Sequence, residues 1–266
     1  MPFIEDVLKY KSISFVGMEK NAGKTQTLNY VLSRLRTFSK TIALTSIGVD
    51  GETTDIVTLT SKPEIEIYPN TTFITSQALY PQREIVSAIE EVSTQTTALG
   101  RLIKAKAITQ GKILLAGPSD TVSLKKLIET LEKNTDLILI DGALSRKTFG
   151  SPSITQAMIL STGASLSASL NVVVKKTKFI YQMTQLPQYE GKHAEQLQQI
   201  ENGIYAITDE GIIDLKIPSL MMIDKYKDKI FDSGTKLFIA GALNDKFVQF
   251  LKIQKNIQDI EIIIKD

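Results

Sequence analysis

The chain has 266 residues, with 31 basic and 29 acidic side chains and 42% apolar residues, a composition ordinary for a soluble globular protein. This even charge balance predicts no nucleic acid and no anionic membrane as the main partner. The absence of cysteine excludes disulfides, thiolate catalysis and cysteine-ligated zinc or iron–sulfur centres. The N-terminus does not resemble a signal peptide and no run approaches the roughly 20 apolar residues of a bilayer span, so a cytoplasmic location is expected.

Short apolar runs rich in β-branched residues follow one another through the first half of the chain. They lie at 12–17, 41–48, 71–76, 112–117 and 136–142. Near-continuous apolar runs are typical of parallel strands buried on both faces. Apolar residues at helical spacing follow Lys24 and recur between 121 and 133, where Ser119 or Asp120 could cap the helix. Strands alternating with helices predict an α/β fold, a mostly parallel sheet flanked by helices, with ligands at the edge where the strands end.

The second half begins with a moderately apolar segment at 153–175, interpreted as a helix, a break at Gly163, and then a helix or strand. The glutamine-rich stretch 182–202 is the best linker candidate, so we expect a nucleotide-binding domain at 1–180 and a smaller α/β region at 181–266. In the smaller region the pattern predicts strands at 203–208, 211–215, 235–241 and 259–266, and helices at 218–229 and 244–254. The chain stops just after an apolar strand, a pattern that favours a truncated C-terminus.

Residues 15–25, "FVGMEKNAGKT", contain the most informative motif. A strand, a glycine-bearing loop and an amphipathic helix follow one another here, and this arrangement turns backbone N–H groups and the positive end of a helix toward an anion. Lys24 would neutralise phosphate charge and the Thr25 hydroxyl would ligate Mg²⁺. The full set of predicted nucleotide contacts is Gly17, Glu19, Lys20, Asn21, Ala22, Gly23, Lys24, Thr25 and Gln26. The alternative is a strand-turn-helix with an accidental Gly-Lys-Thr.

Carboxylates suited to magnesium follow two of the predicted strands. Asp141 ends the run 136–142, where it would hold Mg²⁺ through a water molecule. Asp50 and Glu52 follow the run 41–48 and would orient the attacking water or contact the metal. The predicted catalytic residues are therefore Lys24, Asp50 and Asp141, and the predicted metal ligands are Thr25, Asp50, Glu52 and Asp141. The alternatives are a turn cap for Asp141 and a solvated turn for the other two acids.

The loop departs from the usual G-x-x-x-x-G-K-[ST] spacing, because position 18 is Met18 and the nearest glycine is Gly17. Five residues between the glycines, with Glu19 as an acid, resemble the "GTDT-x-VGKT" loop of dethiobiotin synthetase. The "KNAGKT" stretch resembles the "KNSGKT" of molybdopterin-guanine dinucleotide adaptor proteins. The chain is therefore similar to the MinD, ParA and dethiobiotin synthetase branch of P-loop NTPases, which implies a Rossmann-like P-loop fold, Mg-ATP and a homodimer. Lys20 lies one place later than the signature lysine of MinD-like loops, which in those proteins acts across the dimer, so this sequence departs from the pattern behind that role. The missing N/T-K-x-D stretch favours ATP over GTP.

Four stretches between residues 15 and 167 carry a narrower resemblance: "FVGMEKNAGKTQTLNY", "TSIGVDGE", "IDGALSRK" and "ILSTGASLS". Together they are similar to the ATPase component of lysine 5,6-aminomutase reactivase. This resemblance implies a conformational ATPase acting on a protein partner, an aminomutase or a second reactivase subunit, to release damaged cobalamin. Two alternatives stay open: an ATP-dependent synthetase of the dethiobiotin type, which phosphorylates a small molecule, and a nucleotide-binding module that does not hydrolyse its ligand.

Overall fold

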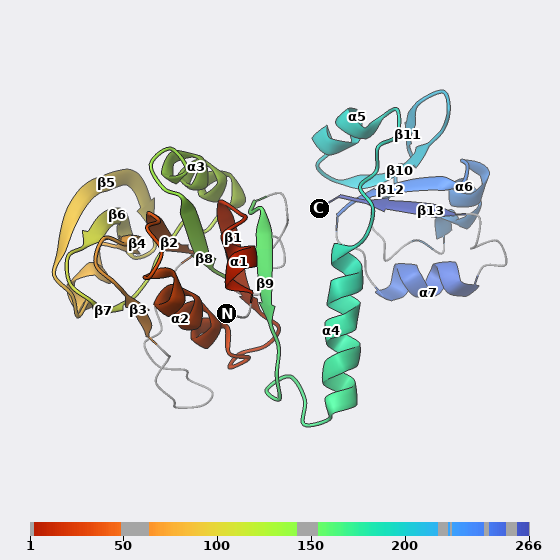
Figure 1. Cartoon of the computed structure of the whole chain (residues 1–266). Helices are drawn as coiled ribbons and strands as arrows, with labels where there is room; N and C mark the ends of the chain where they lie inside the picture. Colours follow the sequence, from red (N-terminus) through yellow and green to blue (C-terminus); the bar gives the residue numbers. More distant parts are fainter. Residues whose placement is uncertain are drawn as a thin grey trace. The chain divides into compact units, whose positions relative to one another are not determined.

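A computed structural model describes residues 3–48, 64–142, 154–217, 223, 225–241, 245–253 and 260–265. The chain divides into two compact units, Met1–Thr184 and Gln185–Asp266, each with its own core (Figure 1). The expected boundary at 180/181 lies close to this division. None of the described helices is long and apolar enough to cross a membrane.

The first unit is built on a seven-stranded sheet with the order β5-β6-β4-β2-β8-β1-β9. The strands are β1 (Ser12–Gly17), β2 (Ile42–Ser46), β4 (Thr72–Ser76), β5 (Ser87–Thr97), β6 (Gly100–Ala107), β8 (Leu137–Asp141) and β9 (Ala157–Ser161). Five neighbouring strands, from β4 to β9 in the sheet order, run parallel, and the β6–β5 hairpin extends the β4 side antiparallel. The expected α/β fold with a mostly parallel sheet flanked by helices is therefore confirmed.

Helices cover the two faces of this sheet separately (Figure 1). On one face lie α1 (Ile4–Val7), α2 (Lys24–Leu35) and a small antiparallel pair formed by β3 (Ile65–Ile67) and β7 (Gly111–Ile113). On the other face lies α3 (Thr121–Leu131). The unit also contains the 3-10 turn η1 (Tyr80–Gln82) and α4 (Leu170–Thr184), none of whose side chains is buried.

The two predicted helices form where their apolar spacing places them. In α2, the expected stripe is fully buried: Leu28, Val31, Leu32 and Leu35. In α3, Asp120 is the N-cap, and its side chain accepts a hydrogen bond from the Ser123 N–H at 2.8 Å. Val122, predicted on the apolar stripe of α3, is instead 64% exposed, because it lies on the opposite side of the helix from the buried Leu124, Ile128 and Leu131.

Two sequence-based expectations in the first unit were wrong, and one pair of strands was missed. The run 112–117 is a strand only up to Ile113, and β7 pairs with β3 outside the main sheet. The predicted helix at the start of 153–175 is instead strand β9, paired with β1. The segment 87–107 forms the long β5–β6 hairpin, which was not predicted because its apolar residues do not alternate regularly and the pairing contains register shifts.

The second unit has a four-stranded sheet with the order β11-β10-β12-β13. Its strands are β10 (Gly203–Ile207), β11 (Ile212–Asp214), β12 (Lys236–Ala240) and β13 (Glu261–Ile264), and its helices are α5 (Ala194–Gln199), α6 (Lys227–Asp232) and α7 (Asp245–Ile253). Only β12 and β13 are parallel. Apolar clusters lie on both faces of the sheet, so this unit too is a small two-sided α/β core.

Candidate functional site

The loop between β1 and α2 leaves the carboxyl end of an inner strand of the sheet. Its backbone turns sharply twice, since Asn21 (φ 59°) and Gly23 (φ 88°) both have left-handed conformations. Gly23 is the N-cap of α2; glycine adopts such a conformation without steric cost, whereas side chains with a Cβ rarely do. The chain therefore turns directly from a buried strand into the N-terminus of a helix, as the sequence predicts.

Three polar residues outside the predicted set, Ser161, Thr27 and Thr177, hold this loop in place through backbone and side-chain contacts. The Met18 N–H donates to the carbonyl oxygen of Ser161, at the end of β9, over 2.9 Å. The Thr27 hydroxyl donates to the Gly23 carbonyl at 3.0 Å and lies 3.3 Å from the Ser161 hydroxyl. The Thr177 hydroxyl of α4 lies 3.3 Å from the Met18 sulfur. Sequence reasoning missed all three. Ser161 reaches the loop through the pairing of β9 beside β1 and Thr177 reaches it from α4, whereas Thr27 lies one helical turn after Gly23, a local spacing that could have been noticed.

The central contact of the site joins two predicted residues from different segments. Lys24 Nζ lies 3.0 Å from Asp141 Oδ1, and the two side chains are 20% and 15% exposed. The pairing of β8 beside β1 creates this contact, because Phe15 and Asp141 are opposite each other in the parallel register and both strands end at the same edge. Since the pair is largely shielded from water, its attraction is stronger than that of an exposed ion pair.

The end of β2 completes the edge beside Asp141. The Ile47 N–H donates to the Asp141 carbonyl, and the Gly142 N–H donates to the Phe15 carbonyl, each over 2.9 Å. These bonds join the ends of β1, β2 and β8. Asp50 and Glu52, predicted to follow β2, lie outside the described residues.

The remaining predicted loop residues surround this pair at different depths. Glu19, Lys20, Asn21 and Gln26 are exposed, whereas Gly17, Ala22, Gly23 and Thr25 are half-buried. The Lys20 N–H donates to the Glu19 carboxylate at 3.1 Å.

Mg²⁺ prefers oxygen ligands and keeps several waters, so a nucleotide site needs few protein ligands. Thr25, in the first turn of α2, and Asp141, at the neighbouring strand end, supply one hydroxyl and one carboxylate, a donor set that fits this ion. Within the described ranges no group of three or more histidine, aspartate or glutamate side chains gathers as a self-sufficient metal site.

Comparison of the chain with protein-family models, with curated proteins and with solved structures gave no match. The geometry of the loop and its neighbours is therefore the basis for assigning a function.

Proposed function

We propose that the β1–α2 loop binds the phosphates of Mg-ATP and that the protein hydrolyses this nucleotide. The observation that carries the proposal is the Lys24–Asp141 pair, 3.0 Å apart at the N-terminus of a helix and at the adjoining ends of two parallel strands. A helix N-terminus and a lysine are suited to bind phosphate, and a carboxylate beside them is suited to bind magnesium.

The chemistry follows from charge neutralisation. The first N–H groups of a helix have no partner within the helix, so those at the start of α2 can donate to phosphate oxygens. In the structure Lys24 pairs with Asp141. With Mg-ATP bound, the Lys24 ammonium group would hold phosphate oxygens and the Asp141 carboxylate would hold a water ligand of the metal. The metal, when bound, neutralises charge on the transferring phosphoryl group.

We propose further that hydrolysis drives a change on a protein partner. The support for this step is the sequence resemblance to the reactivase ATPase component, together with the contact between Met18 in the loop and Thr177 of α4. A loop that moves when phosphate binds would alter this contact, and α4 exposes apolar side chains along its length, among them Leu170 and Phe179. A protein partner would bind the exposed apolar side chains of α4.

The test is release of inorganic phosphate from Mg-ATP by the purified full chain, alone and with candidate partners. Lys24→Ala should lower turnover about 100-fold or more, as loss of a transition-state donor does, and should weaken nucleotide binding. Lys133→Ala, an exposed lysine at the end of α3, is the matched control and should behave as the unaltered protein.

The other outcomes separate the alternatives. Turnover that appears only with a small metabolite would assign a synthetase, and nucleotide binding without turnover would assign a binding module. If the unaltered chain binds no nucleotide, or if Lys24→Ala binds and hydrolyses as well as the control, the proposed site is wrong.

A further inference from the structure

Two hydroxyl groups connect the end of β9 with the N-cap of α2. The Ser161 hydroxyl donates to the Thr27 hydroxyl oxygen over 3.3 Å, and the Thr27 hydroxyl donates to the Gly23 carbonyl over 3.0 Å. The Thr27 N–H donates to the same carbonyl over 2.9 Å, which is the backbone bond that opens the helix. Two hydrogen bonds from one residue therefore fix the direction of the Gly23 carbonyl.

The direction of the Gly23 carbonyl decides where the Lys24 N–H points. Both groups belong to one planar trans peptide, in which C=O and N–H point in opposite directions. Because the carbonyl is turned toward the body of α2, the Lys24 N–H points out of the start of the helix. Packing does not hold this peptide, since a Cβ added at Gly23 would have no neighbour within 4 Å among the described residues. The two bonds from Thr27 therefore hold it.

Ser161 supplies its hydroxyl from a rigid position. It ends β9, is 8% exposed, and lies opposite Gly17 in the parallel register. A threonine in a helix often bonds the carbonyl four residues earlier, but here a second hydroxyl, from another strand, donates to that threonine. With its oxygen accepting from Ser161, the single hydroxyl proton of Thr27 is left for Gly23. Successive hydrogen bonds of this kind strengthen one another.

We propose that Ser161 is a positioning residue of the nucleotide site, which acts through Thr27 to aim the Lys24 N–H at a bound phosphate. This inference rests on the proposed function, because a phosphate is the ligand of that N–H. The first N–H groups of a helix have no partner within the helix and are suited to donate to an anion. In this role neither hydroxyl contacts the ligand, so their removal changes the direction of a donor and removes no contact.

A positioning role has a kinetic signature that a loss of stability lacks. A backbone N–H that holds phosphate does so in the substrate complex and in the transition state alike. A misdirected N–H therefore raises KM for Mg-ATP and changes kcat little. Partial unfolding has the opposite effect, because fewer active molecules lower the apparent kcat and leave KM unchanged. Steady-state phosphate release, measured over a range of Mg-ATP concentrations, separates the two.

Four variants of the full chain test the order of the two hydroxyls. Thr27→Val keeps the branched shape and removes the hydroxyl, so KM should rise about 3–10-fold, the range of one net hydrogen bond. Ser161→Ala should raise KM about 2–5-fold, since it removes only the support of that bond. Thr27→Ser keeps the hydroxyl and should leave KM within about twofold of the unaltered chain. In the double variant, Ser161→Ala should add nothing to Thr27→Val, because Ser161 acts through Thr27.

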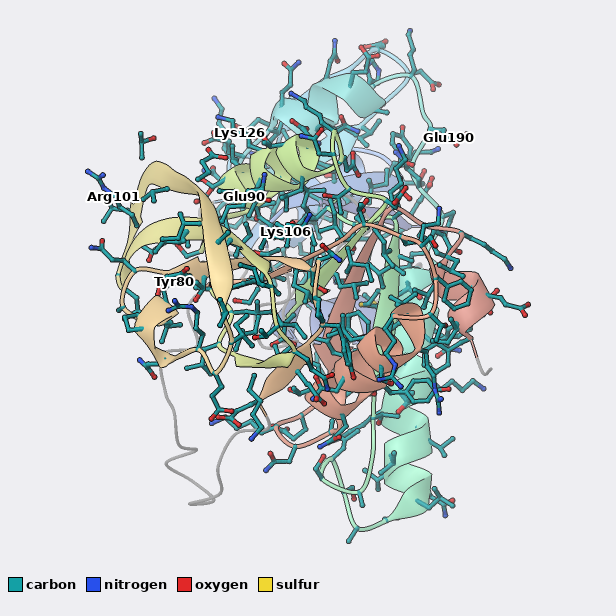
Figure 2. The ribbon with its side chains drawn as sticks, turned by 60° about the vertical axis from the view of Figure 1, so that its left-hand side comes forward. Tyr80, Glu90, Arg101, Lys106, Lys126 and Glu190 are labelled. Atoms are coloured by element: carbon teal, nitrogen blue, oxygen red, sulfur yellow. The ribbon has the colours of Figure 1, made fainter. Side chains whose placement is uncertain are left out.

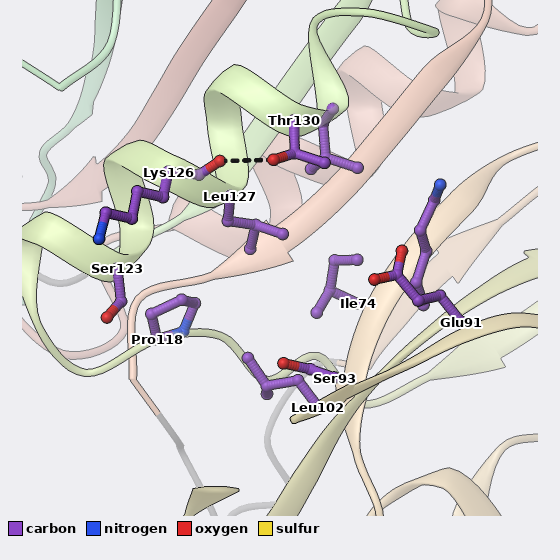
Figure 3. Close-up of a pocket in the computed structure, with 11 residues that line it drawn as sticks. Ile74, Glu91, Ser93, Leu102, Pro118, Ser123, Lys126, Leu127 and Thr130 are labelled. Carbon is purple, nitrogen blue, oxygen red and sulfur yellow. Dashed lines mark hydrogen bonds between the residues drawn. The ribbon is translucent and has the colours of Figure 1, made fainter. Parts of the chain in front are cut away.

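Helix α3 offers a matched control, on the opposite face of the sheet from α2. Lys126 is exposed on this helix (Figure 2). The Thr130 hydroxyl donates to the Lys126 carbonyl, four residues earlier, over 2.8 Å (Figure 3). Thr130→Val therefore removes the same kind of bond from a helix that does not begin at the loop, and KM and kcat should both match those of the unaltered chain.

A second measurement needs no nucleotide. The residual dipolar coupling of the Lys24 N–H reports the direction of that bond, and it should change in Thr27→Val and Ser161→Ala but not in Thr130→Val. An unchanged KM and coupling in Ser161→Ala, a lower kcat at unchanged KM, or additive effects in the double variant would overturn the role of Ser161 alone. If the unaltered chain binds no Mg-ATP, the proposed function fails, and the role of Ser161 fails with it.

Discussion

Strands β8 and β12 end in similar sequences, "LILIDGAL" from residue 137 and "LFIAGAL" from residue 237, and their surroundings differ in one decisive way. In the first unit Asp141 ends β8 at the edge where the β1–α2 loop brings Lys24 to 3.0 Å. In the second unit the matching position is Ala240, which is 4% exposed and packs with Phe238 and Leu197 on one face of the sheet. A strand-end turn is thus a common structural element. It becomes a candidate site only where the helix that follows a neighbouring strand begins with a lysine close to the strand end, as α2 does with Lys24.

The largest expected effect tests whether the two units are separate bodies. Phe73 in β4 and Phe247 in α7 are both almost fully buried, each in the core of its own unit. Phe73→Ala and Phe247→Ala should each lower the free energy of unfolding of their own unit by about 3–5 kcal/mol. Scanning calorimetry of the full chain should show a different part of the unfolding transition move in each variant. If both variants shift one single transition equally, the units do not unfold separately.

The next effect tests the strand-end comparison directly. Asp141→Asn keeps the shape of the side chain and removes the charge opposite Lys24. ATP turnover should fall at least about tenfold, since outer-shell partners of a metal typically contribute about 10–100-fold in affinity or activity. Ala240→Asp places the acid in the second unit instead, where it meets apolar neighbours. We expect it to lower the stability of that unit, because burying an unpaired charge is costly.

Phosphate release and thermal unfolding, measured on both variants, check this prediction. Turnover unchanged in Asp141→Asn would remove Asp141 from the proposed site. Turnover as low in Ala240→Asp as in Asp141→Asn would show that the loss reflects general instability.

The smallest effect concerns the amino ends of two neighbouring strands of the first unit, β8 and β2. Asp136, just before β8, accepts hydrogen bonds from the Thr41 N–H at 2.8 Å and the Thr41 hydroxyl at 2.7 Å, just before β2. These bonds lower the pKa of the Asp136 carboxyl below its ordinary value, which is about 3.9. Because the folded-state pKa is depressed, this contribution to stability is complete above about pH 4 and is lost as the pH falls through the lower, folded-state pKa.

Asp136→Asn should therefore destabilise the protein at pH 6, and the difference from the unaltered chain should shrink as the pH falls below about 4. Urea unfolding at a series of pH values measures both quantities. Asp228→Asn, at an exposed position in the first turn of α6, is the control. A difference between Asp136→Asn and the unaltered chain that stays constant from pH 6 to pH 2 would contradict the prediction.

Strand β1, helix α2 and the position of Lys24 could be predicted because the information is local. A buried strand, a glycine turn and a helical stripe follow each other within about 25 residues, and each obeys its own periodicity. The same holds for β8 and for the Asp120 cap of α3. In the second unit, most of the expected strands and helices formed at the expected positions for this reason.

The elements that were missed depend on partners far away in the sequence. The segment 154–161 is apolar enough for a helix, and pairing with the exposed edge of β1 makes its second half strand β9. In the β5–β6 hairpin, Ile89 and Val92 are about half exposed. The apolar residues of β5 therefore do not alternate between buried and exposed positions, and the sequence lacks the period of two that predicts a strand. For both, tertiary context overrides local preference, as it commonly does for strands.

The sequence by itself determined the groups that can bind phosphate: a lysine and a hydroxyl at the start of a helix, and an acid at the end of a buried strand. Those residues are encoded by local patterns of turn, strand and helix. Only the tertiary structure decided which of them meet. The order of strands in a sheet is set by long-range packing, and that order places β8 beside β1, so that Lys24 faces Asp141.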